Sequence, residues 1–194
     1  SFTPDLGNAA APFPLGEMPA AYHLAIHPST ELHGMHHALT EWEVPALDAT
    51  RYRDAWRAVF RRHACLRVCA ADDGTARIDP ELAPVVEVHD LSKATASEAA
   101  AHLERLWAKW ADADLPGAPY LRHWVTLLPG GGARICEYYS AIVCDAMTLQ
   151  RVHAEVQALY LDLATALPPV PAFSWRDYVL ADVAVRTSAR GVAA

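Results

Sequence analysis

The sequence predicts an α/β sandwich of two layers, and three observations lead to it. Helical patterns with one apolar face alternate along the chain with short apolar segments that are typical of strands. The strand-like segments are joined by turns rich in Gly, Asp and Pro, which supply the backbone angles of tight turns. No internal repeat or low-complexity linker interrupts this order, so we expect residues 1–194 to form a single domain.

The first half of the chain is expected to contain a strand, a helix, a hairpin and a further strand. Residues 34–44 alternate loosely between apolar and polar side chains and stop before Pro45, which predicts a strand. Asp48 can cap a helix that follows it. Residues 66–70 and 75–78 flank Asp73-Gly74, a hairpin signal, and residues 85–89 form the next strand. The buried face of the helix is predicted from helical spacing to be Tyr52, Ala55, Trp56, Val59, Phe60 and His63.

A second helix and a long hairpin are predicted next. Thr95 and Glu98 have the spacing of a capping box at the start of the helix. Residues 120–128 and 133–143 flank the turn 129–132, and the second arm is apolar enough for a central strand. The apolar stripe of the helix is Ala99, Leu103, Leu106, Trp107 and Trp110.

The second arm of this hairpin leads through Asp145 directly into a third helix. Residues 168–171, Pro-Pro-Val-Pro, are expected to end that helix, and Ser174 with Asp177 opens a last one. The apolar face of the third helix is predicted to be Leu149, Val152, Val156, Leu159, Tyr160 and Leu163.

Composition excludes several classes of function. The 16 basic and 23 acidic residues give a formal charge of −7, which disfavours general binding to nucleic acid or to an anionic membrane surface. No apolar run approaches the roughly 20 residues that span a bilayer, and the first residues lack the basic start of a signal peptide. We therefore expect a cytoplasmic protein. The four cysteines lie in apolar segments without CxxC spacing, so we expect small buried side chains and neither disulfides nor a zinc site.

Five short segments carry a resemblance to a known family: residues 13–22 (Phe-Pro-Leu-Gly-Glu-Met-Pro-Ala-Ala-Tyr), 62–67 (Arg-His-Ala-Cys-Leu-Arg), 88–91 (Val-His-Asp-Leu), 134–148 and 173–178 (Phe-Ser-Trp-Arg-Asp-Tyr). In this order they resemble the condensation and heterocyclization domains of nonribosomal peptide synthetases. Such domains have two lobes of chloramphenicol-acetyltransferase-like fold with the active site between them, and this chain resembles the N-terminal lobe. The heterocyclization branch condenses cysteine, serine or threonine and closes a thiazoline or oxazoline ring.

The catalytic motif of that family is altered in this chain. Condensation domains carry HHxxxDG and heterocyclization domains carry DxxxxD, where this sequence has Ser140, Ala141 and Asp145. Alanine at the second position cannot orient or deprotonate an amine, and serine at the first keeps a hydroxyl but loses the charge. We therefore expect no catalytic residue among the three. The resemblance implies that Asp145 makes a structural ion pair with an arginine, for which Arg67 and Arg134 are the candidates.

Two further groups of residues were weighed as binding sites. His33, His36 and His37 lie close together but alternate in direction on a strand, and His23 and His27 precede Pro28, so we expect no metal site. Arg53, Arg57 and Arg61 form a basic stripe on a helix, which in most proteins is only a solvated face. The resemblance makes the stripe a candidate docking site for a carrier protein, which would bring its own phosphopantetheine. No cofactor is expected on the chain itself.

Three functions remain open from the sequence. The first is a non-catalytic, truncated half domain that acts as an interaction or structural module beside peptidyl or acyl carrier proteins or neighbouring synthetase domains. The second is a lobe of an active enzyme, completed by a second lobe that supplies the residues for cyclodehydration. The third, an acyltransferase using a free thioester, is disfavoured by Ala141. An unpaired lobe would expose apolar surface, which a symmetric homodimer would cover.

Overall fold

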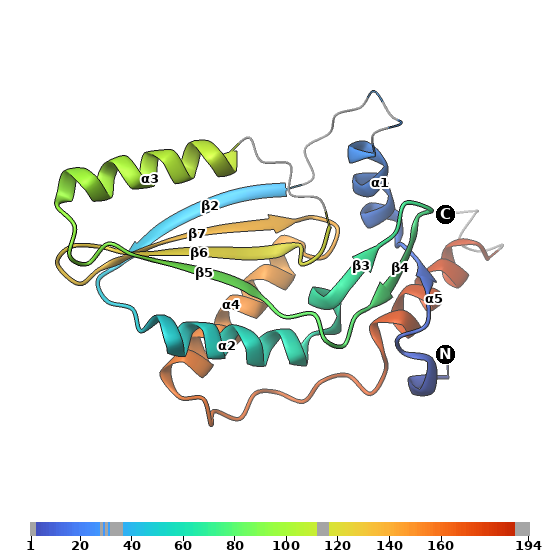
Figure 1. Cartoon of the computed structure of the whole chain (residues 1–194). Coiled ribbons are helices and arrows are strands. Elements are labelled where there is room, and N and C mark those ends of the chain that lie inside the picture. The colour runs from blue at the N-terminus through green and yellow to red at the C-terminus, as the bar shows by residue number, and fades with distance from the viewer. Residues whose placement is uncertain (1–2, 28, 30, 32–36, 112–116, 189–194) are drawn as a thin grey trace.

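The computed structural model describes residues 3–27, 29, 31, 37–111 and 117–188. A four-stranded sheet forms its centre (Figure 1). β7 lies inside the sheet, as its apolar sequence predicted, and pairs antiparallel with β2 and with β6. β5 is parallel to β6. The strands lie in the order β2 (His37–Val44), β7 (Ala133–Ser140), β6 (Leu121–Leu127) and β5 (Val85–Asp90).

Helices cover both faces of this sheet. α2 (Ala49–Arg62) and α4 (Ala146–Leu161) pack together on one face, and α3 (Ala96–Ala111) lies on the other (Figure 1). α3 joins β5 to its parallel neighbour β6, and such a connection has to cross over a face of the sheet. The predicted α/β sandwich is confirmed, and α3 adds a helical layer to the two layers that were expected.

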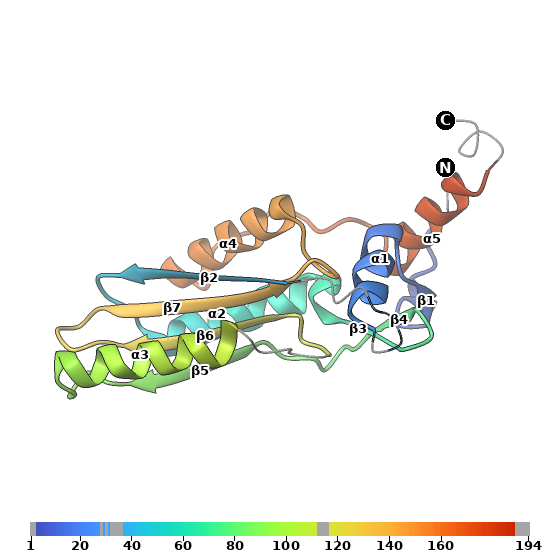
Figure 2. The ribbon, with the colours of Figure 1, turned by 90° about the horizontal axis from the view of Figure 1, so that it is seen from above.

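A smaller three-stranded sheet lies at one end of the sandwich. Its strands are β1 (Phe13–Pro14), β4 (Thr75–Ile78) and β3 (Val68–Ala70), in that order and all antiparallel. α1 (Glu17–Ile26) and α5 (Trp175–Arg186) lie beside this sheet (Figure 2). Two short 3₁₀ helices, η1 (Leu6–Asn8) and η2 (Ala64–Arg67), complete the described elements.

The predicted helix starts are confirmed by their caps. The Asp48 carboxylate accepts hydrogen bonds from the backbone of Thr50 and Arg51 at 2.9 and 3.0 Å. Thr95 and Glu98 bond reciprocally before α3, and Ser174 and Asp177 form a full capping box at α5. These side chains satisfy backbone N–H groups that have no partner inside the helix.

The predicted end of α4 is wrong. The helix stops at Leu161 and does not continue toward the proline segment, and Leu163 is consequently exposed. The Asp162 carboxylate accepts a hydrogen bond from the backbone of Ala164, a local turn that competes with continuation of the helix. β2 begins at His37, and the first residues of the strand predicted over 34–44 lie outside the described part of the chain.

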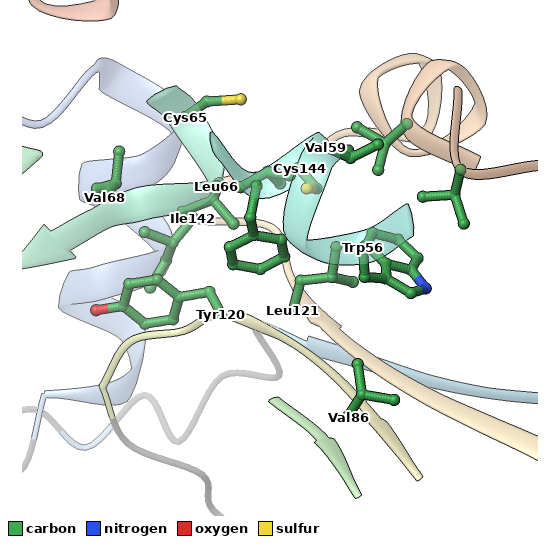
Figure 3. Close-up of a cluster of buried hydrophobic side chains, with 14 of the residues drawn as sticks. Trp56, Val59, Cys65, Leu66, Val68, Val86, Tyr120, Leu121, Ile142 and Cys144 are labelled. Atoms are coloured by element: carbon green, nitrogen blue, oxygen red, sulfur yellow. The ribbon is translucent and has the colours of Figure 1, made fainter. Parts of the chain in front are cut away.

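The main hydrophobic core fills the space between the sheet and the helices α2 and α4. Trp56 and Val59 of α2 meet Leu121 of β6 and Cys144 of the turn after β7 (Figure 3). Five of the six predicted core positions of α2 are buried, whereas His63 ends the helix and is only partly buried. Phe60, Leu66 and Leu121 are fully enclosed.

Other predictions of burial hold only in part. Trp107 of α3 is 40% exposed, so not every residue of the apolar stripe predicted for that helix is buried against the sheet. All four cysteines are free, but only Cys65 and Cys144 are buried, while Cys69 and Cys136 are partly accessible. Among the described residues, no helix is both long enough and apolar enough to cross a lipid bilayer.

Candidate functional site

A cavity of about 540 Å³ lies where β7 passes into α4. Its floor is the turn 141–145, and its sides come from β1, α1 and α5 at the end of the sandwich. The wall combines apolar side chains with five aromatic rings and a few charged groups. The aromatic residues are Phe13, Tyr22, Tyr139, Trp175 and Tyr178. This composition suits a bound group that is largely apolar and held by a few polar contacts.

Ser140, at the first motif position, does not line this cavity. Its side chain is fully buried, and its Oγ accepts a hydrogen bond from the backbone N–H of Ile142 at 3.2 Å. The Ser140 backbone N–H donates to the carbonyl of Tyr120 at 2.8 Å, which fixes the end of β7 against the sheet. The hydroxyl therefore stabilises the turn and is not part of the cavity wall.

Ala141, at the second motif position, does line the cavity. A larger side chain at this position would therefore meet the cavity contents. The methyl group present can neither accept nor donate a proton, which leaves the position without acid–base chemistry.

Asp145, at the last motif position, is the N-cap of α4. Its Oδ1 accepts a hydrogen bond from the backbone N–H of Thr148 at 2.7 Å. Hydrogen bonding to the side chain and then to the backbone of Thr148 holds the pKa of Asp145 below its usual range. The side chain is exposed at the mouth of the cavity. Asp145 thus stabilises the helix start that forms one side of the site.

The ion pair expected for Asp145 is not formed. None of the ion pairs found among the described residues includes Asp145. Arg67 points elsewhere because its guanidinium donates to the carbonyls of Phe60 at 2.9 Å and Arg61 at 3.3 Å, at the C-terminal end of α2. These carbonyls have no partner inside the helix, so they are free to accept hydrogen bonds from the charged guanidinium of Arg67.

Arg134 is also committed to other partners. It lies on β7 directly opposite Glu43 of β2, and its Nε donates to the Glu43 carboxylate at 3.0 Å. A second contact joins Arg134 to Glu41 at 3.5 Å. The hydrogen bonds that Arg134 donates to Glu43 raise the pKa of Arg134. The cross-strand register of the sheet therefore decides the partner of Arg134.

The other charged groups of the wall are paired, and its thiol is buried. Arg186 of α5 forms ion pairs with Glu17 and with Asp182, which joins α1 to α5 across the mouth. Burial raises the pKa of the Cys144 thiol far above neutrality, so this sulfur stays protonated and unreactive. The described wall residues thus offer a shaped pocket, and no nucleophile activated by a neighbouring base is evident among them.

A second cavity of about 470 Å³ adjoins the first across the start of α4. Thr148, Trp175 and Tyr178 line both cavities. Arg62, at the end of α2, and Arg151, on α4, give the second cavity a basic wall. The Glu155 carboxylate accepts hydrogen bonds from Arg62 at 2.9 Å and from His63 at 2.6 Å.

The predicted basic stripe lies on α2, and the last residue of this helix, Arg62, lines the second cavity. Arg57 and Arg61 are exposed on α2, whereas Arg53 is partly buried. Arg57 is in contact with Asp54 at 3.1 Å, and both side chains are about half exposed. Arg61 precedes Arg62, which lines the cavity, but the stripe residues themselves are not part of the cavity lining.

The described histidines among the candidate metal ligands, His23, His27 and His37, do not form a metal-binding cluster with one another. His23 lies on α1 with its ring centre 6.4 Å from that of His27, and no carboxylate or thiol joins them in a described cluster. His37 lies on β2, and His33 and His36 fall outside the described residues.

The contribution of α1 and α5 to the site was missed by sequence analysis. α1 has no buried residue and therefore no apolar stripe to reveal it. Pro19 lies in the first turn of α1, where proline is tolerated. The segment 173–178 had been noticed only as a family motif, and its aromatic residues Trp175 and Tyr178 prove to be cavity walls.

Comparisons with known proteins agree with this architecture. No protein-family model matches the chain. It is 32% identical over 180 residues to the phenyloxazoline synthase MbtB of Mycolicibacterium paratuberculosis, a match that covers 90% of this chain but only 15% of that protein. It is 30% identical over 184 residues to the pyochelin synthetase PchF of Pseudomonas aeruginosa, covering 91% of this chain and 10% of the relative.

Among solved structures, the cyclization-docking bidomain of the nonribosomal peptide synthetase EpoB from Sorangium cellulosum superposes with a TM-score of 0.86 at 28% identity. That match covers 97% of this chain and 38% of the bidomain. The chain thus spans only a small part of its curated relatives and less than half of the matching structure. By sequence and by fold, the chain belongs to the condensation and heterocyclization domain family of nonribosomal peptide synthetases, and the part that it spans matches one lobe of such a domain.

Proposed function

We propose that the chain is a heterocyclization-like half domain that acts as an interaction or structural module of a nonribosomal peptide or hybrid polyketide synthetase and does not itself catalyse condensation. The main support for this proposal is the identity and placement of the three motif residues at the cavity. Ala141 faces the cavity with a methyl group, and the Ser140 hydroxyl is buried in its own turn. Asp145 serves as a helix cap. The fold and the cavity are retained, but the groups that would handle a proton are replaced.

The partners that we propose are a peptidyl or acyl carrier protein and the neighbouring synthetase domains. The exposed Arg57 and Arg61 offer a positive surface on an acidic chain, on the helix whose last residue, Arg62, lines the second cavity. A carrier with an acidic surface would dock there, and its phosphopantetheine arm would be the only cofactor involved. Exposed apolar side chains beside the first cavity, Met18 and Met147, suit contact with a neighbouring domain. A symmetric homodimer over this surface stays a prediction.

The test is a combined binding and product assay. The purified chain is mixed with two carrier proteins, one loaded with an acyl thioester and one with a cysteinyl thioester, and the thioesters are analysed by intact-protein mass spectrometry. We expect measurable carrier binding without an amide or a thiazoline product. An active heterocyclization domain with the same carriers serves as the positive control. Product from the wild-type chain, lost on Asp145→Ala, would show that the chain is catalytic.

A second candidate function is that of an active lobe that works only with a second lobe. The retained cavity and the retained Asp145 at its mouth favour this candidate. It predicts product when the chain is fused to the second lobe of an active heterocyclization domain, and loss of that product when Ala141 is enlarged to Leu and fills the cavity. The module proposed above predicts carrier binding but no product from the same fusion.

A further inference from the structure

Three polar side chains from three separate elements meet inside the main core. His123 on β6 and Glu137 on β7 are directly opposite each other in the antiparallel register. His153 reaches them from α4, which covers this face of the sheet. The Nε2 atoms of His123 and His153 both contact Oε2 of Glu137, at 2.8 and 2.6 Å. One donor atom from each residue lies within 4.8 Å of the other two.

The cluster is buried at one end and accessible at the other. His123 and Glu137 have no exposed surface, whereas the His153 side chain is 37% exposed. An ion could therefore enter past His153 and be held against the sheet. Both imidazoles approach through the same kind of nitrogen, which leaves their Nδ1 atoms directed away from the shared centre.

In the described part of the chain, no lysine or arginine forms an ion pair with Glu137. Its ion pairs among the described residues involve only the two histidines. Burial acts to raise the pKa of Glu137, but the hydrogen bonds from His123 and His153 outweigh burial and lower that pKa to about 2. Burial lowers the pKa of His123, which keeps this imidazole neutral. The carboxylate therefore faces two imidazole nitrogens, and no lysine or arginine among the described residues competes for it.

The site also has an unused acceptor and a rigid wall. Oε1 of Glu137 is buried without a hydrogen-bond partner, as is Nδ1 of His123. An unpaired buried acceptor is costly, so an occupant that engages it would be stabilising. The His123 ring lies 4.1 Å from the Trp56 ring and 5.8 Å from the Tyr52 ring, centre to centre, which holds the imidazole in one orientation.

We propose that His123, Glu137 and His153 form a binding site for one divalent transition-metal ion, with Zn²⁺ as the ion to test. Two imidazole nitrogens and one carboxylate oxygen form a ligand set used by zinc sites that leave a fourth position open. Zn²⁺ at about 2.0–2.2 Å from each donor needs donors roughly 3.3 Å apart. The present contacts are shorter, so His153 would move outward slightly or Glu137 would present its free Oε1. Fe²⁺ and Co²⁺ suit the same ligands.

The first experiment titrates Zn²⁺ alone into the full chain after treatment with a chelator, by isothermal titration calorimetry. We expect one ion per chain with a Kd on the order of 1 μM or tighter, and an increase in Tm on zinc addition, because an ion that binds the folded state stabilises it. Absence of stoichiometric binding by the folded chain would mean that the cluster is a complete hydrogen-bonded network and would overturn the proposal.

Two variants and one control locate the ion. His153→Ala removes the accessible ligand and Glu137→Gln removes the charge. Each should weaken zinc binding by more than about 100-fold, since even an outer partner of a zinc ligand contributes roughly 10 to 100-fold. His63→Ala is the matched control, because His63 also contacts a glutamate, Glu155, at 2.6 Å but lies outside the cluster. Circular dichroism confirms folding, and His153→Ala keeps the test informative if Glu137→Gln does not fold.

Cobalt distinguishes this site from a cysteine site elsewhere in the core. Co²⁺ bound to two imidazoles and a carboxylate should show ligand-field bands without thiolate charge-transfer absorption, and the bands should disappear in His153→Ala. Thiolate absorption, or equal zinc affinity of His153→Ala and the wild type, would show that the ion binds elsewhere and would refute the proposal.

Discussion

Asp145 illustrates how one residue of an altered motif can keep a structural role. Its carboxylate accepts the Thr148 backbone N–H at the start of α4. Removal of an N-cap side chain costs about 1 kcal/mol, so Asp145→Ala should lower the free energy of unfolding by about that amount. Asn caps helices about as well as Asp, and Asp145→Asn should therefore cost much less. Urea unfolding of both variants checks the prediction, and an equal loss in both would indicate a role for the charge instead of the cap.

The contribution of Asp145 should also depend on pH. The folded-state pKa of this carboxyl lies below its usual range because of the Thr148 hydrogen bonds. A depressed folded-state pKa means that the stabilisation is complete above the unfolded-state pKa and is lost as the pH falls through the folded-state value. The difference in unfolding free energy between wild type and Asp145→Ala should thus be constant near neutral pH and shrink in acid. A difference that grows on acidification would contradict this assignment.

The sequence predicted the motif residues at the cavity but not the residues of the polar cluster. Ala141 and Asp145 were placed at the site by motif position, and both line the cavity. His123, Glu137 and His153 were missed because spacing alone does not unite them. One signal was present: a tight turn that sets Leu127 opposite Ala133 also sets His123 opposite Glu137. The approach of His153 depends on how α4 packs, which local patterns do not encode.

At the scale of elements, α3 is anchored to the sheet by one aromatic stack. The rings of Trp110 and Trp124 lie 3.9 Å apart at 21°, and both side chains are buried. Trp110→Ala should lower the free energy of unfolding by about 3 to 5 kcal/mol, because it removes a large buried side chain and leaves a cavity. Trp107→Ala, on the same helix but 40% exposed, is the control and should cost much less. Similar losses in both variants would mean that helix propensity, and not the stack, holds α3.

Elements with strong local signals were predictable, and elements formed by tertiary contact were not. α2, α3 and α5 have side-chain caps that the sequence shows directly. β1 is two residues long and exists only through its pairing with β4. The additional layer formed by α3 was not predicted for a similar reason. The position of α3 on a face of the sheet follows from the parallel pairing of β5 with β6.

At the scale of the whole molecule, charge is distributed unevenly. The formal charge is −7, yet Arg57 and Arg61 are exposed on α2, whose last residue, Arg62, lines the second cavity. A negatively charged partner would be repelled by most of the surface and attracted locally. Such steering weakens with added salt, because exposed charges are screened beyond roughly 8 Å at physiological ionic strength.

Charge reversal tests whether this local surface binds a carrier protein. The double variant Arg57→Glu, Arg61→Glu should weaken carrier binding by about tenfold or more at low salt, and the difference from wild type should shrink at high salt. Lys93→Glu with Arg105→Glu, in the α3 region, changes the net charge equally and is the matched control. Binding by surface plasmon resonance over a salt series measures both. If both double variants lose affinity equally, net charge alone governs the encounter and α2 is not the docking surface. Loss confined to the α2 variant would instead place the carrier beside the cavity that its phosphopantetheine arm would enter.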